Sequence, residues 1–315
     1  MRATSSLLIA THEECADHRP FPGHPERPQR LQAAIKGADG LGARLLPVTV
    51  NESDALRAIL TAHDATLPER LRTACASGPQ VFDSDDNPIS EGTYRAALAA
   101  VAASIAAVGE VDARAATRVW IPVRPPGHHA LRDRAMGFCF FNNAAIATED
   151  LLKRGIGPVA VVDFDVHHGN ATQQHFWERN DVFYLSVHRY PFYPGTGAGD
   201  EIGSGPGRGF TRNYPLAAGA DDDMYSGAVA AGLEDVLSVV TPAAWVISAG
   251  FDAHREDPLG GMKVTEAGFA AIGELLGQAA GKKPILAVLE GGYALEALSR
   301  SVRTFLAALD GGVTS

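Results

Sequence analysis

Short apolar runs rich in β-branched residues alternate along this chain with longer segments that carry Ala and Leu at helical spacing. The strand-like runs are SLLIAT at 6–11, RVWIPV at 118–123, PVAVVDFD at 158–165, VFYLSVH at 182–188, AWVISAGFD at 244–252 and PILAVLEGGY at 284–293. The helical segments are 92–110, 142–155, the stretch after Asp222, 266–280 and 294–309. Strands that are apolar at successive positions are buried on both faces, and their alternation with helices implies right-handed crossovers. We therefore expect an α/β fold with a doubly wound, mainly parallel sheet and helices on both faces.

The segment RYPFYPGTGAGDEIGSGPGRGF at 189–210 interrupts this alternation, because it is rich in Gly and Pro and has no periodicity. Long irregular loops in compact domains are usually functional or disordered, and the interleaved aromatic residues favour a packed functional loop. The sequence contains no internal repeat, low-complexity tract or interdomain linker. We therefore expect residues 1–315 to form a single domain.

The bulk composition excludes several classes of protein. Its 46% hydrophobic and 20% charged residues are typical of a globular domain. A net charge of −10 without a basic cluster removes the phosphate attraction on which nucleic-acid binding depends. No wholly apolar stretch reaches the roughly 18 residues of a membrane span, and the N-terminal run is too short for a signal peptide, so we expect a cytoplasmic protein without membrane association. The three cysteines form no CxxC pair, which indicates reduced thiols, and the sequence is compatible with a homo-oligomer.

Polar residues close four of the predicted strands. They lie in RPPGHH at 124–129, DFDVHHGN at 163–170, SAGFDAH at 248–254 and LEGGY at 289–293. In open α/β sheets, ligands bind outside the carboxyl ends of the strands. These four strand ends are therefore the predicted functional site.

The spacing of Asp163, Asp165 and His167 predicts a metal site. In an extended backbone, alternate side chains point to the same side, and two carboxylates placed together repel unless a cation lies between them. Asp165 and His167, with Asp252 from another strand end, give three protein ligands and an open position, which is the pattern of a catalytic zinc site. A single D-x-D is as often a hydrogen-bonded loop, but the other strand ends favour the metal. A binuclear D-x-H-x-D pattern would need a carboxylate where Gly169 stands, which favours one ion per chain.

The tandem His128 and His129 form a second cluster. A lone histidine is more often structural than catalytic, but on a tight glycine turn both rings can face a cleft. A histidine with a pKa near neutral suits transfer of a proton from water to a leaving amine. The hydroxyl of Tyr293 could donate to an oxyanion, although GGY alone would favour a core tyrosine.

Taken together, the motifs resemble those of the zinc-dependent histone deacetylases, in particular the class II branch with its bacterial histone deacetylase-like amidohydrolases and acetylpolyamine amidohydrolases. The resemblance covers most of the chain in the family's order. It rests on HPERPQRL at 24–31, RPPGHHA at 124–130, MGFCFFNNAAIA at 136–147, VVDFDVHHGNAT at 161–172, YPFYPGTG at 190–197, SAGFDAHREDPLGG at 248–261 and LEGGY at 289–293. The implied fold is the arginase/deacetylase fold.

The resemblance implies a role for each of the residues expected to bind the metal or to take part in the reaction. Zn²⁺ would be bound by Asp165, His167 and Asp252. His129 would be the general base and acid, with His128 as its electrostatic partner, and Tyr293 would donate to the oxyanion. Asp163 would orient His128. Asn170 stands where class I members carry an aspartate, so a neutral amide would orient His129.

The resemblance also implies a substrate pocket and a second ion. A narrow tunnel would be walled by Phe138 and Tyr193, with Gly137 and Leu259 along it. Arg27 would lie near its inner end, and Asp86 would hold the substrate at the rim. A structural K⁺ would be bound by the backbone of Asp163, Asp165, His167 and Val187 and by the Ser186 hydroxyl.

The predicted function is zinc-dependent hydrolysis of linear amides, which removes acetyl or longer acyl groups from acetylated lysine side chains. The main alternative is a deacetylase of acetylated polyamines with the same mechanism, because both substrates present an acetamide on a methylene chain. The apolar Leu259 at the gate favours acyl-lysine. An inactive acyl-lysine binder is disfavoured by the intact ligand set and Tyr293, and an arginase-like ureohydrolase is disfavoured by Gly169.

Overall fold

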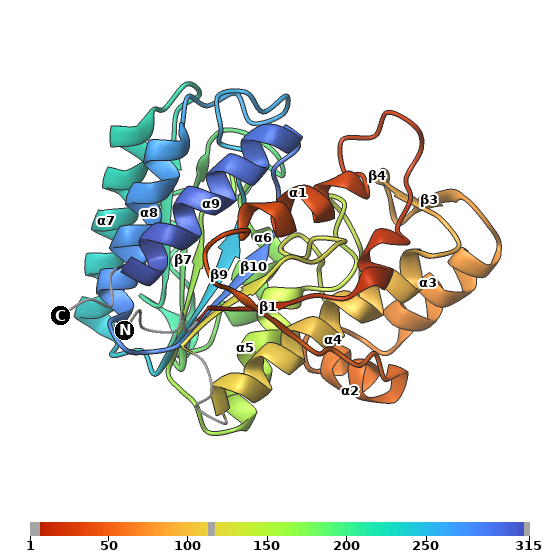
Figure 1. Cartoon of the computed structure of the whole chain (residues 1–315). Helices are drawn as coiled ribbons and strands as arrows, with labels where there is room; N and C mark the ends of the chain where they lie inside the picture. Colours follow the sequence, from red (N-terminus) through yellow and green to blue (C-terminus); the bar gives the residue numbers. More distant parts are fainter. Residues whose placement is uncertain (1–6, 113–116, 312–315) are drawn as a thin grey trace.

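The computed structural model describes residues 7–112 and 117–311. Its centre is an eight-stranded parallel sheet with the order β2-β1-β5-β10-β9-β6-β7-β8 (Figure 1). The strands are β1 (Leu7–Ala10), β2 (Arg44–Leu46), β5 (Arg118–Ile121), β6 (Val159–Asp163), β7 (Val182–Arg189), β8 (Thr211–Leu216), β9 (Ala244–Ala249) and β10 (Ile285–Leu289). The doubly wound parallel fold expected from the sequence is confirmed.

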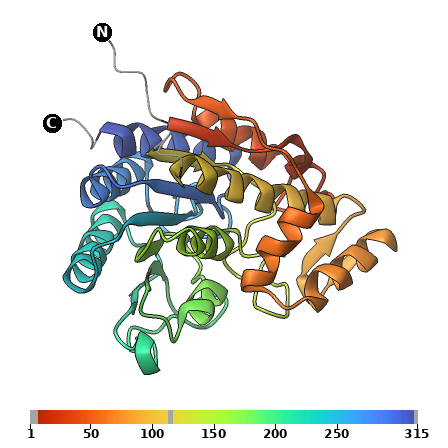
Figure 2. The ribbon, with the colours of Figure 1, turned by 90° about the horizontal axis from the view of Figure 1, so that it is seen from below.

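Helices cover both faces of the sheet, as the view from below shows (Figure 2). One layer holds α1 (Gln29–Gly37), α7 (Asp222–Val239), α8 (Glu266–Ala280) and α9 (Leu295–Gly311). The other holds α2 (Glu52–Ala62), α3 (Thr66–Ala76), α4 (Thr93–Asp112), α5 (Asn143–Lys153) and α6 (Asn170–Phe176). Side chains of β6 alternate between the two cores: Val161 packs under α4 and α5, and Val162 packs in the layer of α7 to α9. Burial on both faces explains why these strands are apolar at every position.

Helix α4 is the one described helix that is long and apolar enough to cross a membrane. However, 72% of its most apolar stretch is buried inside the protein. Its alanines pack against β1, β5 and the helices α2 and α5. This burial is the pattern of a core helix.

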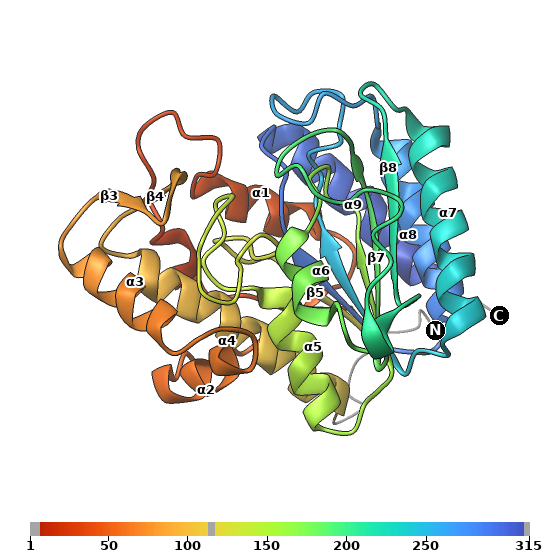
Figure 3. The same ribbon diagram turned by 180° about the vertical axis from the view of Figure 1, so that it is seen from behind.

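The six predicted strands and five predicted helices are all present, but several short elements were not predicted from the sequence. Edge strands β2 and β8 lack long apolar runs, since one side of each is open, and β8 contains Pro215. Figure 3 shows β8 at one edge of the sheet beside β7. An antiparallel hairpin of β3 (Gln80–Phe82) and β4 (Ser84–Ile89) was also missed. The loop at 189–210 is irregular, as expected. It is tied down where the ring of His188 donates to the Gly197 carbonyl at 2.9 Å.

The sheet order explains how distant segments meet. The four strand ends with polar residues belong to β5, β10, β9 and β6, which are consecutive neighbours in the sheet. Parallel strands present their carboxyl ends at one edge. Segments more than 100 residues apart along the chain therefore converge on one place.

A buried ion network joins the start of α1 to the segment after β5. The carboxylate of Glu26 accepts from Arg30 at 3.0 Å and from two guanidinium nitrogens of Arg124 at 2.5 and 2.6 Å. The ring of His18 lies 3.2 Å away, and all four side chains are buried. Burial alone would raise the pKa of Glu26, but Arg124 and His18 outweigh it, so that pKa lies well below its usual range.

We expect Glu26→Gln to lower the free energy of unfolding by about 3–5 kcal/mol at pH 7, because it leaves two buried guanidinium groups without their counter-charge. Urea unfolding followed by circular dichroism measures this. The matched control is Glu69→Gln, which breaks the exposed ion pair of Glu69 with Arg72 and should leave the urea midpoint unchanged.

The same network predicts an acid dependence. Because the folded-state pKa of Glu26 is depressed, its stabilisation is complete above the ordinary value of 4.5 and is lost as the pH falls through the folded-state value. The difference in the free energy of unfolding between wild type and Glu26→Gln should therefore be constant above pH 4.5 and shrink at lower pH. An unchanging difference down to pH 2 would contradict this explanation.

Candidate active site

Three side chains at adjoining strand ends form a compact group of potential metal ligands. Nδ1 of His167 lies 3.1 Å from the carboxylate of Asp165 and 3.2 Å from that of Asp252. All three ligand atoms lie within 4.8 Å of one another, and both carboxylates are fully buried. Backbone amides fix the carboxylates: Gly291 donates to Asp165 at 2.7 Å, and Val166 donates to Asp252 at 2.9 Å. The structure therefore brings the predicted zinc ligands together.

The local chemistry fits a cation at this point. Oδ2 of Asp252 is buried and has no hydrogen-bond partner, which is costly unless an ion satisfies it. Burial and the neighbouring Asp165 raise the pKa of Asp252 to about 7, which reflects uncompensated negative charge. A side chain at Gly291 would lie 2.0 Å from Oδ2 of Asp252, so only glycine leaves the carboxylates free.

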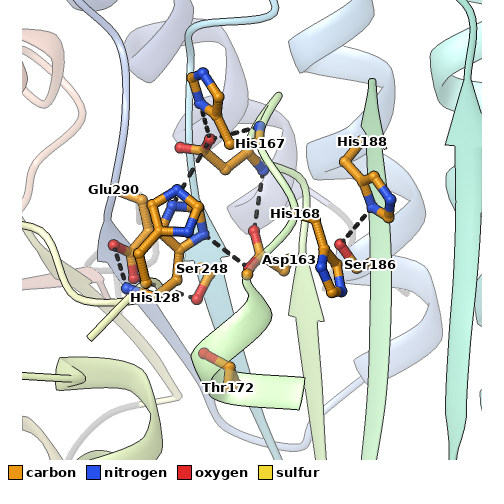
Figure 4. A network of polar contacts seen from close by, with 12 residues as sticks. His128, Asp163, His167, His168, Thr172, Ser186, His188, Ser248 and Glu290 are labelled. Atoms are coloured by element: carbon orange, nitrogen blue, oxygen red, sulfur yellow. Dashed lines mark hydrogen bonds and ion pairs between the residues drawn. The ribbon is translucent and has the colours of Figure 1, made fainter. Parts of the chain in front are cut away.

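The two adjacent histidines lie beside this group on the turn after β5. Their ring centroids are 3.9 Å apart, and Nδ1 of His128 lies 3.1 Å from Asp163 (Figure 4). Nδ1 of His129 donates to Oδ1 of Asn170 at 2.7 Å, which leaves its Nε2 without that proton. Gly137 permits this packing, because a side chain there would lie 2.4 Å from the His129 ring.

Their surroundings shift the pKa values of the His128 and His129 rings in opposite directions. Burial alone would lower the pKa of His128, but the nearby carboxylates, led by Asp163, raise it to about 10. Burial, with the nearby rings of His128 and His167, lowers the pKa of His129 well below its usual range. His129 is therefore neutral and able to accept a proton, whereas His128 carries a positive charge.

Tyr293 follows β10 and lies against aromatic and cationic groups. Its ring meets the edge of Phe138 at 5.9 Å, and the Arg30 guanidinium lies 4.7 Å from its centroid. Its backbone N–H donates to Asp257 at 2.7 Å. Burial raises the pKa of the phenol well above its usual range, so the hydroxyl remains a donor.

A pocket of about 310 Å³ opens onto these side chains. It is lined by Asp86, His129, Gly137, Phe138, His167, Phe192, Tyr193, Leu259 and Tyr293. The residues predicted for the tunnel wall and the rim therefore meet in one pocket. Asp86 is already engaged, since its Oδ2 accepts from the Tyr193 hydroxyl at 2.8 Å and from the Gly137 amide at 3.1 Å.

Arg27 does not take the place predicted for it. Its side chain is exposed and does not line the pocket. The buried arginine of this segment is Arg30, which packs against the Tyr293 ring: its Nε donates to the Gly292 carbonyl at 2.6 Å, and Nη2 donates to the Glu290 carbonyl. The reason is helical geometry, because α1 begins at Gln29 and turns Arg30 towards the sheet while Arg27 precedes the helix.

The residues predicted for K⁺ lie at the end of β6, in the segment directly after it, and on β7. Asp163 pairs with Ser186 across the two strands, and the Ser186 hydroxyl lies 2.9 Å from Nδ1 of His188. The Tyr225 hydroxyl donates to the carbonyls of Val187 at 2.8 Å and Asp165 at 3.4 Å. A carbonyl has two lone pairs, so this contact leaves capacity for a cation, and K⁺ stays a prediction.

Two residues of the site were missed from the sequence. Phe192 stacks on the His167 ring with centroids 5.2 Å apart, and the Arg189 guanidinium lies 4.0 Å from its centroid. Aromatic residues in the 189–210 loop were the available signal. The second missed residue is Glu290, which is fully buried. The available signal was a charged residue in LEGGY directly after an apolar strand.

Comparisons with known proteins identify the family of this chain. The histone deacetylase domain model matches residues 24–309. Histone deacetylase 15 of Arabidopsis thaliana is 37% identical over 98% of this chain, which spans 57% of that protein. The histone deacetylase-like amidohydrolase of Pseudomonas aeruginosa is 38% identical over 86% of this chain and 73% of its own. The crystal structure of an acetylpolyamine aminohydrolase from Burkholderia pseudomallei has a TM-score of 0.84 at 30% identity and covers 98% of both chains. The fold, the site and these relatives show that the chain belongs to the histone deacetylase family.

Proposed function

We propose that this protein is a zinc-dependent amidohydrolase that removes acetyl groups from acyl-lysine side chains. One observation carries the proposal: the group of Asp165, His167 and Asp252 adjoins a pocket that also presents His129 and Tyr293. Membership of the histone deacetylase family supports the reaction class.

Zinc would be held by Asp165, His167 and Asp252. When bound, it would lower the pKa of a water molecule towards about 7 and polarise the amide carbonyl. The orphaned buried oxygen of Asp252 supports this assignment. The proposed structural K⁺ would stabilise the segment that carries these ligands.

The protein's own groups would move the protons. Neutral His129, held by Asn170, would accept a proton from the attacking water and return it to the departing amine. His128, held by Asp163, would supply positive charge beside it. The Tyr293 hydroxyl would donate to the oxygen that becomes negative in the transition state.

The pocket favours acyl-lysine over acetylated polyamines. Selecting the distal ammonium of a polyamine requires a free carboxylate near the mouth, and Leu259 at the gate is apolar. The other candidate, Asp86, already accepts hydrogen bonds from Tyr193 and Gly137. An apolar pocket discriminates between substrates that differ by one methylene by only about 1 to 3 kcal/mol. Removal of longer acyl groups is therefore also compatible with the proposal.

We expect purified, zinc-loaded protein to have a higher kcat/KM for a fluorogenic acetyl-lysine peptide than for acetylputrescine. Rates measured side by side, with and without a chelator, check this. A large preference for acetylputrescine would replace the substrate proposal with polyamine deacetylation, an activity that the name of the Burkholderia structure favours.

The variant Leu259→Glu tests the basis of the substrate preference, because it adds a carboxylate at the gate that could bind the distal ammonium of a polyamine. The ratio of kcat/KM for acetylputrescine to that for the peptide should rise about fivefold, since a partly exposed ion pair is worth up to about 1 kcal/mol. The control Leu259→Gln has a similar shape without the charge and should leave the ratio near that of wild type. Equal ratios in both variants would remove Leu259 as a selector.

A further inference from the structure

We infer that Glu290 is a positioning residue that sets the orientation of the two site histidines. This inference rests on the proposed function, because its effect is read through amide hydrolysis. It assigns a role to a buried carboxylate that is not among the three ligands proposed for zinc and does not line the pocket. Its carboxylate groups instead with the His128 ring and the Cys139 thiol, within 4.8 Å of both.

Glu290 follows β10 and points under the turn that carries the histidines (Figure 4). Its Oε2 accepts from the backbone N–H of Gly127 at 2.7 Å and of His128 at 3.1 Å. Its Oε1 accepts from the Ser248 hydroxyl at 3.3 Å. One side chain therefore joins the ends of β5, β9 and β10, and its own exposure is 0%.

The backbone around His128 is held from both sides. Glu290 fixes its N–H, while its carbonyl accepts from the amides of Ala171 and Thr172 at 3.2 and 3.4 Å. The turn also lies close to the start of α5, an approach that requires glycine, because a side chain at Gly127 would lie 2.6 Å from the Asn143 nitrogen. By holding the N–H of His128, Glu290 limits rotation of the turn. The orientation of the turn sets the direction of both histidine rings.

Among the described residues, no cationic side chain donates a hydrogen bond to the carboxylate of Glu290: the ring of His128 lies within 4.8 Å of it but pairs with Asp163. Arg30 contacts the backbone carbonyl of Glu290 and not its carboxylate. Burying a carboxylate is costly where no cation is hydrogen-bonded to it, and a charged acceptor forms shorter and stronger bonds to N–H groups than a neutral one. The carboxylate is therefore better explained by the need to hold the turn rigidly than by a gain in the stability of the fold.

The test is Glu290→Gln, which keeps the shape but replaces the charged acceptor of the Gly127 and His128 N–H groups with a neutral amide oxygen and turns the NH₂ group towards the Ser248 hydroxyl. We expect kcat on the acetyl-lysine peptide to fall about 10- to 100-fold, because misplacing a catalytic group by about 1 Å costs about 100-fold. KM should stay within about twofold, and zinc content should stay at the wild-type value. A purely structural residue would lower the melting temperature without this split between kcat and KM.

The matched control is Asp222→Asn, a carboxylate that also tethers backbone, accepting from the Thr265 amide at 2.7 Å in the α7 and α8 layer. It should lower stability and leave kcat unchanged. A folded, zinc-loaded Glu290→Gln with wild-type kcat overturns the inference, as does an equal loss of kcat in both variants.

Ser248→Ala covers the case in which Glu290→Gln does not fold, because it keeps the carboxylate but removes the hydroxyl that steadies it. Its kcat should fall severalfold at constant KM, and an unchanged kcat overturns the inference. Wild-type protein that hydrolyses neither the peptide nor acetylputrescine would instead refute the proposed function. Active wild-type protein with unaffected variants refutes the positioning role alone.

Discussion

Tyr293→Phe is expected to lower kcat on the acetyl-lysine peptide by about 100- to 1,000-fold while KM changes little. Loss of one preorganised donor to a transition-state oxyanion typically has this effect. The substitution removes only the hydroxyl, because the ring contacts with Phe138 and Arg30 remain. Steady-state rates of wild type and variant, both zinc-loaded, measure the effect.

The control for this prediction is Tyr94→Phe, which removes another largely buried phenol hydroxyl, the one that donates to Glu52 at 2.8 Å. It lies on α4, away from the pocket, so its kcat should match that of wild type. Tyr293→Phe with a kcat within threefold of wild type would remove the donor role that we assign.

His167→Ala is expected to weaken zinc binding by more than about 100-fold, since even the outer partners of metal ligands are worth about 10- to 100-fold in affinity. The protein should hold one zinc per chain as wild type and almost none as the variant. Elemental analysis after dialysis gives this result without relying on activity. Hydrolysis by wild type should stop on chelation and return on addition of zinc.

The adjacent His168 provides a matched control. Its ring points away from the proposed ligands (Figure 4), with its nitrogens 2.7 Å from the Thr196 hydroxyl and 3.0 Å from Gln173. His168→Ala should therefore keep one zinc per chain. Two ions per wild-type chain, or stoichiometric zinc in His167→Ala, would disprove the site as assigned.

The sequence predicted the central strands well because their signal is local. An apolar run such as 158–165 is buried on both faces, and the aspartates that end it mark the site edge in the same stretch. The edge strands β2 and β8 have no such signal, since half of their surroundings is solvent. Each pairs with a single strand, β2 with β1 and β8 with β7, so one edge of each has no partner strand.

The errors inside the site have a similar origin. Arg27 and Arg30 are equally plausible in the sequence, and only the start of α1 decides which one turns inwards. Glu290 reaches Gly127 because β10 lies next to β5, an order that chain position does not reveal. The motifs therefore indicated residues that the structure brings together at the pocket, but not the buried groups that support them.

The sheet order also has a consequence for biosynthesis. β10 is the last strand of the described chain, yet it lies between β5 and β9 in the middle of the sheet. Until a ribosome has released residues 285–289, two apolar strand edges have no partner and are open to pairing with other chains. Tyr293 and Glu290 arrive on the same segment. A nascent chain of this protein thus acquires β10 and the last residues of the candidate site in one step, when residues 285–293 leave the ribosome.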